Sequence, residues 1–210
     1  MHTRSKLLLA GLTAGLLMAV AVGSASANRL SVSSRNFRAV WSNLRFFGEG
    51  GIEAEAQCPV TLEGSFHSGT ISKVIGALIG HVTSAVSGSG AACRRGSSTI
   101  LRETLPWHIT YEGFSGTLPR ITTVTLLVRG VAFRVDPGIG IACRYGHATE
   151  NARGIINLGA SGEANSLRAD ESIRLRGFGE FGCPPEGGFE GTTSSLTVQG
   201  GTTRITIRLI

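Results

Sequence analysis

Alternation of apolar and polar residues with a period of two is the feature that most restricts what this chain can fold into. Successive side chains of a β-strand point to opposite faces, so this alternation is typical of half-buried strands. Near the C-terminus, Gln199-Gly200-Gly201-Thr202 separates two short alternating segments, as in a hairpin with a glycine turn. The alternation recurs at 52–58, 105–111, 173–176 and 196–209, and the segment 123–135 is apolar on both faces for part of its length, as in a central strand.

Composition agrees with many short strands joined by turns. The chain has 30 glycines and 6 prolines in 210 residues, without a Gly-X-Y period. The segment 71–86 is ambiguous, because its apolar residues have helical spacing but are mostly β-branched and are interrupted by Gly76 and Gly80. We favour a strand there, with a single packed helix as the alternative. The predicted fold is all-β and mainly antiparallel, either a β-sandwich or a flattened barrel.

The N-terminus has the three parts of an export signal. Arg4 and Lys6 precede an apolar run of 16 residues, 7–22, and small residues stand at Ala25 and Ala27. The run is shorter than the roughly 20 residues that span a bilayer, which favours cleavage over a membrane anchor. We therefore expect a signal peptide over 1–27 and one domain over 28–210. The expected location is secreted or on the cell surface, with no transmembrane segment after cleavage.

All four cysteines follow the signal. An even number in an exported chain predicts disulfides, here two, and three pairings are possible. We favour Cys58–Cys93 with Cys143–Cys183, because these separations of 35 and 40 residues close local loops. A Cys58–Cys183 pair is the main alternative. Because no Cys-x-x-Cys occurs, a four-cysteine metal site is not expected.

One stretch carries a family resemblance. The residues 105–119 (LPWHITYEGFSGTLP), together with CPVTLEGSF at 58–66, resemble a group of uncharacterised exported β-rich proteins of high-GC actinobacteria. The resemblance implies export and a single β fold over most of the mature chain. It implies no activity.

Motifs for catalysis, cofactors and metals are not found in the sequence. Serine occurs near glycine at 113–116 and 159–162, but without Gly-x-Ser-x-Gly spacing, and Asp136 and Asp170 are the only two aspartates. His67, His81, His108 and His147 form no metal-binding pattern and are each expected at the surface or a strand edge. No catalytic, cofactor or metal residue is predicted.

Two candidate binding surfaces remain. Trp41, Trp107 and Tyr111 would stack against sugar rings if exposed, although the last two share a face with apolar neighbours that favours the core. Four arginines fall on the outward faces of two predicted strands, and they would form a basic ladder if those strands were neighbours. These are Arg174, Arg176, Arg204 and Arg208.

The charge is mild. The formal net charge of +6 becomes +4 when Arg4 and Lys6 are removed with the signal, and no nucleic-acid partner is expected. The predicted function is that of a non-enzymatic, exported binding or envelope-associated protein, whose ligand would be an anionic cell-wall polymer or a sugar. A structural surface protein without a ligand, or an exported hydrolase or isomerase without a visible motif, is the alternative. The sequence predicts neither the ligand nor the oligomeric state.

Overall fold

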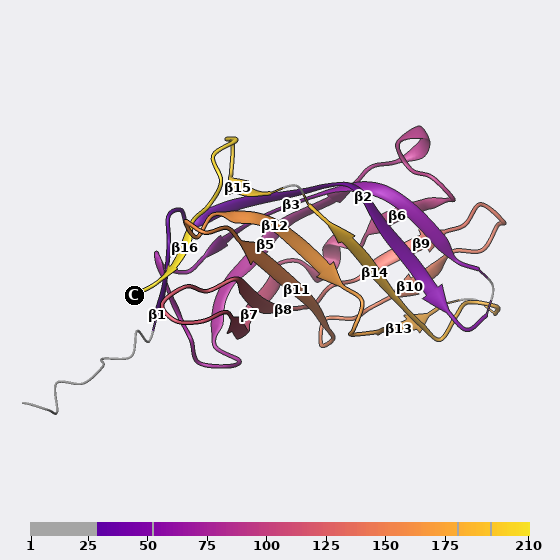
Figure 1. Cartoon of the computed structure of the whole chain (residues 1–210). Coiled ribbons are helices and arrows are strands. Elements are labelled where there is room, and N and C mark those ends of the chain that lie inside the picture. The colour runs from indigo at the N-terminus through magenta and orange to yellow at the C-terminus, as the bar shows by residue number, and fades with distance from the viewer. Residues whose placement is uncertain (1–28, 52, 180, 194) are drawn as a thin grey trace, which may run out of the picture.

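Eight antiparallel strands form a closed β-barrel in the computed structural model, which describes residues 29–51, 53–179, 181–193 and 195–210 (Figure 1). Each strand pairs with the next in the order given below, and the last pairs with the first through five residue pairs. This closure leaves the barrel without an edge. The strands are β2 (Asn36–Glu49), β3 (Glu55–Phe66), β5 (Leu78–Ser87), β7 (Trp107–Ser115), β8 (Thr123–Arg129), β11 (Asn151–Leu158), β12 (Ala164–Asp170) and β14 (Glu186–Thr192).

The period-two pattern explains the inside and outside of the barrel. In β2, buried Phe37, Ala39 and Trp41 alternate with exposed residues until the register with β3 shifts between Trp41 and Leu44. Further shifts occur in the pairings of β3 with β5, β5 with β7, β7 with β8 and β11 with β12. Bulges of this kind bend and twist strands, which allows a sheet to curve into a barrel.

Two glycines permit β3 and β5 to come close at one of these shifts. A Cβ atom added to Gly64 would lie 2.2 Å from the carbonyl oxygen of His81, and one added to Gly80 would lie 2.4 Å from that of Ser65. Real Cβ atoms do not approach other atoms so closely, so neither position accepts a larger residue without movement of the backbone.

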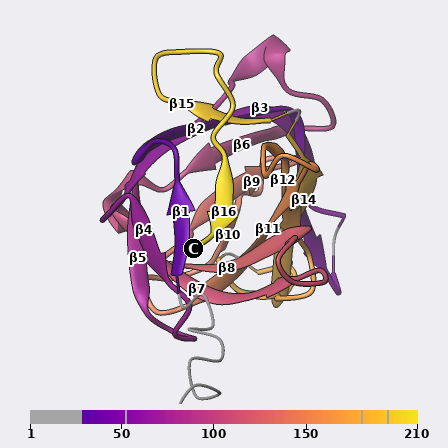
Figure 2. The same cartoon turned by 60° about the vertical axis from the view of Figure 1, so that its left-hand side comes forward.

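A small sheet covers each end of the barrel. At one end β1 (Arg29–Val32) pairs with β4 (Thr70–Ser72) and β16 (Ile207–Leu209), and Figure 2 shows β1 and β16 lying across that end. At the other end four strands continue from β14, and Figure 1 shows them away from β16. These are β13 (Leu175–Phe178), β10 (Cys143–Tyr145), β9 (Phe133–Asp136) and β6 (Ser97–Ile100).

The remaining elements are short. β15 (Leu196–Val198) pairs with β2, and the chain then turns back so that Thr197 bridges Arg204, which confirms the C-terminal hairpin. Two 3₁₀ turns, η1 (Gly90–Ala92) and η2 (Arg102–Thr104), lie in connections. No helix in the described residues is long and apolar enough to cross a membrane.

The all-β, antiparallel fold is confirmed, and its form is a barrel rather than a sandwich. In the segment 71–86 the strand is confirmed and the helix alternative is wrong: β4 ends at Ser72 and β5 begins at Leu78. Gly76, with φ of +80°, reverses the chain between them. The predicted signal peptide, 1–27, lies outside the described residues.

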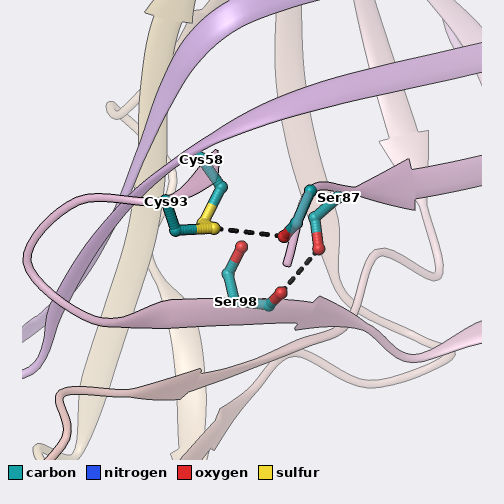
Figure 3. Close-up of a disulfide and its surroundings, with 5 residues drawn as sticks. Cys58, Ser87, Cys93 and Ser98 are labelled. Atoms are coloured by element: carbon teal, nitrogen blue, oxygen red, sulfur yellow. Dashed lines mark hydrogen bonds between the residues drawn. A yellow bond between two sulfur atoms is a disulfide. The ribbon is translucent and has the colours of Figure 1, made fainter. Parts of the chain in front are cut away.

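Both disulfides form as predicted, Cys58–Cys93 and Cys143–Cys183. The first joins β3 to the loop between β5 and β6, where the Ser87 hydroxyl donates a hydrogen bond of 2.6 Å to the Ser98 carbonyl oxygen (Figure 3). The second joins β10 to the segment before β14. Each disulfide therefore attaches part of the end sheet of β6, β9, β10 and β13 to the barrel.

Candidate functional site

The barrel encloses an apolar cavity of about 80 Å³. All eight barrel strands contribute to its lining, and Ile100, Val131 and Phe133 close it toward the end sheet of β6 and β9. A single water-sized sphere occupies about 10–15 Å³, so this space corresponds to roughly five to eight such spheres. A cavity of roughly 150 Å³ holds a benzene ring, so this interior has room for a smaller apolar group.

Small residues on one side of the barrel account for much of this space. Ala152 and Gly154 of β11 and Ala169 of β12 line the cavity and face inward. Strands β2 and β7 instead carry large side chains at the cavity, among them Trp41, Phe46 and Trp107. In a barrel of eight strands, the inward-pointing side chains normally fill the interior. Here the small inward residues of β11 and β12 leave part of it unfilled.

Trp41 and Trp107 both line the cavity, but only one has its indole N–H satisfied. The Trp107 Nε1 donates a hydrogen bond of 2.9 Å to the Thr104 hydroxyl. The Trp41 Nε1 is buried without a hydrogen-bond partner, and the residue is 3% exposed. A buried donor without an acceptor costs about 1–3 kcal/mol, so Trp41 is a residue of the cavity lining whose indole N–H lacks an acceptor.

The predicted aromatic platform is not at the surface. Trp41, Trp107 and Tyr111 are 3%, 2% and 3% exposed, because all three share the inward face of their strands with other core residues. Burial raises the pKa of Tyr111. The prediction that these residues form an exposed stacking surface for sugars is therefore wrong, and Trp41 and Trp107 line the interior cavity instead.

The four predicted arginines do not form one ladder. Arg174 and Arg176 lie at β13, whereas Arg204 and Arg208 lie beside and within β16, which pairs with β1 rather than β13. The condition that the two strands be neighbours is not met, because each strand belongs to the sheet at a different end of the barrel (Figure 1).

Local acids already engage one of these arginines. Arg174 makes two hydrogen bonds of 2.7 and 2.8 Å to the Glu49 carboxylate and stacks on the Phe47 ring at 5.0 Å. The hydrogen bond to Glu49 raises the Arg174 pKa. Arg174 and Arg176 line a shallow polar hollow, but Glu150 and Glu186 line it as well. The hollow therefore has no formal excess of positive charge.

Glu55 is a buried carboxylate at the start of β3, and it is fully engaged in ion pairs. It lies 3.3 Å from an Arg45 nitrogen and 3.1 Å from an Arg95 nitrogen, and it accepts a hydrogen bond of 2.9 Å from Gln57. Burial raises the pKa of Glu55, but the hydrogen bonds from Gln57 and Arg45 outweigh it and the net shift is downward. A carboxylate held ionised in this way is suited to stabilising the fold and not to donating protons near neutral pH.

Three histidines that the sequence places far apart meet on the outer face of β3, β5 and β7. The His67 Nε2 and His81 Nδ1 are hydrogen-bonded at 2.9 Å, and the His81 and His108 rings pack edge to face with centroids 4.9 Å apart. Burial lowers the His81 pKa, and the nearby His67 and His108 add to the effect. Sequence motifs missed this cluster because cross-strand register, not spacing along the chain, brings the histidines together.

Comparison with known proteins found no matching family model, no similar curated protein and no similar solved structure. The resemblance of 105–119 to exported actinobacterial proteins therefore stays a prediction.

Proposed function

We propose that this protein is an exported, non-enzymatic binding protein that holds a small, mainly apolar molecule inside its barrel. The observation that carries the proposal is the apolar cavity inside the barrel, whose lining residues include Trp41 with its buried, unpartnered indole N–H. Buried polar groups are nearly always hydrogen-bonded, and ligand pockets are mostly apolar with a few polar groups that orient the ligand.

The cavity defines the chemistry of its guest. A volume of about 80 Å³ is smaller than the roughly 150 Å³ cavities that hold a benzene ring, so it suits a short branched chain, and its largely apolar surface selects against charge. The indole N–H is a donor only, so the guest would carry one acceptor such as a carbonyl, ether or hydroxyl oxygen. We place the proposed ligand site in the interior and not at the four arginines, because these arginines are divided between the two ends of the barrel.

A pair of probes of matched shape tests the anchor. Acetone and isobutene have the same planar, branched shape and fit a small cavity, but only the ketone has an acceptor. In ¹H–¹⁵N spectra the two tryptophans give two indole signals, and we expect acetone to shift the Trp41 signal much more than isobutene does. Trp41→Phe should weaken acetone binding by about two- to tenfold, equivalent to one hydrogen bond, and leave isobutene binding nearly unchanged.

Two further variants separate a lost anchor from a lost fold. Ala152→Val adds two methyl groups to the cavity wall and should block both probes while the barrel stays folded. Val40→Ala, at an outward position of the same strand as Trp41, should change neither affinity. If neither probe binds the unaltered protein, or if both bind Ala152→Val as well, the interior is not a ligand site and the structural alternative is favoured.

The export part of the proposal rests on the N-terminal sequence, with weak support from the two disulfides. The expected mature chain begins at Asn28, after the Ala25-Ser26-Ala27 site. Intact mass of the protein recovered from the culture medium measures this directly. Recovery solely in a membrane fraction, with residues 1–27 attached, would contradict cleavage.

A further inference from the structure

The histidine cluster lies on the outer surface of the barrel, away from the interior cavity. His67 follows directly after β3, and its backbone N–H donates a hydrogen bond of 2.9 Å to the Ile79 carbonyl oxygen, which keeps it beside β5. His81 of β5 is directly opposite His108 of β7 in the antiparallel register. Three neighbouring segments thus present one imidazole each to the same patch of surface.

Two of the imidazoles already have nearly the separation of metal ligands. Two nitrogens bound at 2.0–2.1 Å to one tetrahedral zinc ion lie roughly 3.3 Å apart. The His67 Nε2 and His81 Nδ1 lie 2.9 Å apart along a hydrogen bond. To bind one ion, the two nitrogens must separate by a few tenths of an ångström, and both rings must turn so that their lone pairs meet at an ion beside the line that joins the nitrogens. The pair is therefore arranged so that an ion can replace the proton that the two nitrogens share.

The third imidazole would join the pair only after the rings turn. As they stand, no group of three histidine, cysteine or acidic side chains in the described ranges is placed to hold a metal ion. His67 and His108 are exposed, however, so their rings turn without disturbing the core. The centroid separation of 4.9 Å between the His81 and His108 rings places the third donor within reach of the same ion.

We propose that His67, His81 and His108 form a surface site for one divalent transition-metal ion, with water completing the coordination. A set of neutral imidazoles suits Zn²⁺, Ni²⁺ and Cu²⁺, and it disfavours Mg²⁺ and Ca²⁺, which take oxygen ligands. Arg129 is directly opposite His108 in the register of β7 and β8, and its positive charge opposes the binding of a cation there. The site is independent of the interior cavity.

Titration of the tag-free protein with Zn²⁺, followed by calorimetry, tests the site. One ion should bind per chain, and Co²⁺ should show the visible absorption of a nitrogen-ligated ion. His81→Asn should weaken Zn²⁺ binding by at least about tenfold, and a His67→Asn/His108→Asn double variant should do the same. The double variant changes only exposed positions, so it tests Zn²⁺ binding by the histidine cluster even if His81→Asn is unstable.

His147, the remaining histidine of the expected mature chain, serves as the matched control. His147→Asn should bind Zn²⁺ as the unaltered protein does, and Ca²⁺ should bind to none of these proteins. Unchanged Zn²⁺ affinity in the His67→Asn/His108→Asn variant, or an equal loss in His147→Asn, would overturn the proposal. Because the readout is metal binding, its failure says nothing about the interior cavity.

Discussion

At the scale of single residues, burial of a polar group has different consequences at Glu55 and at Trp41. Glu55 is 6% exposed, yet two arginines and a glutamine engage its carboxylate, so its charge is compensated. Trp41 is 3% exposed, and its N–H is without a partner. The first residue is therefore expected to govern stability, and the second to govern what the interior binds.

Glu55→Gln should destabilise the protein at pH 7 by about 1–3 kcal/mol, because it leaves Arg45 and Arg95 without this carboxylate. The folded-state pKa of Glu55 is lowered, so its stabilising contribution is complete above the unfolded value of about 4.3 and is lost as the pH falls through the folded value. The Tm difference between the two proteins should thus be largest above about pH 5 and should shrink in acid.

A surface ion pair provides the control for Glu55→Gln. Glu103 lies 3.2 Å from Arg144, and both side chains are more than half exposed. Exposed pairs contribute little, so Glu103→Gln should change stability by less than about 1 kcal/mol. A pH-independent Tm difference between Glu55→Gln and the unaltered protein would contradict the assignment of the ion pairs.

At the scale of elements, the C-terminal strand completes one end of the barrel. Ile205 and Ile207 are 0% and 1% exposed, and Leu209 packs partly buried against the core, as the alternation predicted. The Ile205 N–H donates a hydrogen bond of 3.0 Å to the Leu196 carbonyl oxygen, and the Ile207 N–H donates one of 2.7 Å to the Gly162 carbonyl oxygen. Residues near the end of the chain thus hold together connections that lie far apart in sequence.

Removal of 203–210 should therefore abolish folding. It deletes two fully buried side chains and one partly buried one, each contributing up to about 1.5–3 kcal/mol, against a typical total stability of about 5–15 kcal/mol. It also removes β16, the partner of β1. Circular dichroism and thermal melting measure the effect. Deletion of Ile210 alone, which is exposed, should leave the Tm nearly unchanged, and a 203–210 deletion with normal melting would refute this role.

At the scale of the whole molecule, the two disulfides act on separate parts of the chain. The loops 58–93 and 143–183 do not overlap, so their effects on the entropy of the unfolded chain should add. Loops of 35 and 40 residues correspond to about 3–4 kcal/mol each in the loop-entropy description. Together they represent a large share of the stability expected of a chain of this size.

Cys58→Ala/Cys93→Ala and Cys143→Ala/Cys183→Ala should each lower the free energy of unfolding by about 2–4 kcal/mol, measured by denaturant melts. The variant without all four cysteines should show the sum of both losses or be unfolded. When the unaltered protein is reduced with increasing dithiothreitol, its stability should fall to that of the variant without all four cysteines. If either pair of substitutions leaves stability unchanged, the corresponding disulfide does not constrain the fold in this way.

The sequence by itself determined the local and pairwise features. Period-two alternation reports which residues share a face of a strand, so the antiparallel all-β class and the C-terminal hairpin followed from it. Cysteine separation reports loop length, and the shortest sequential pairing proved correct. These properties depend on neighbours along the chain or on a single long-range pair.

Only the tertiary structure decided which strands became neighbours and what their apolar faces enclose. Pairing of β14 with β2 closes the barrel and places the apolar face that carries Trp41 around a cavity, whereas alternation alone does not specify what that face packs against. The separation of Arg176 from Arg208 and the meeting of His81 with His108 are likewise results of strand order. Strand order depends on how distant segments bury their apolar faces against one another, and no local period encodes that choice.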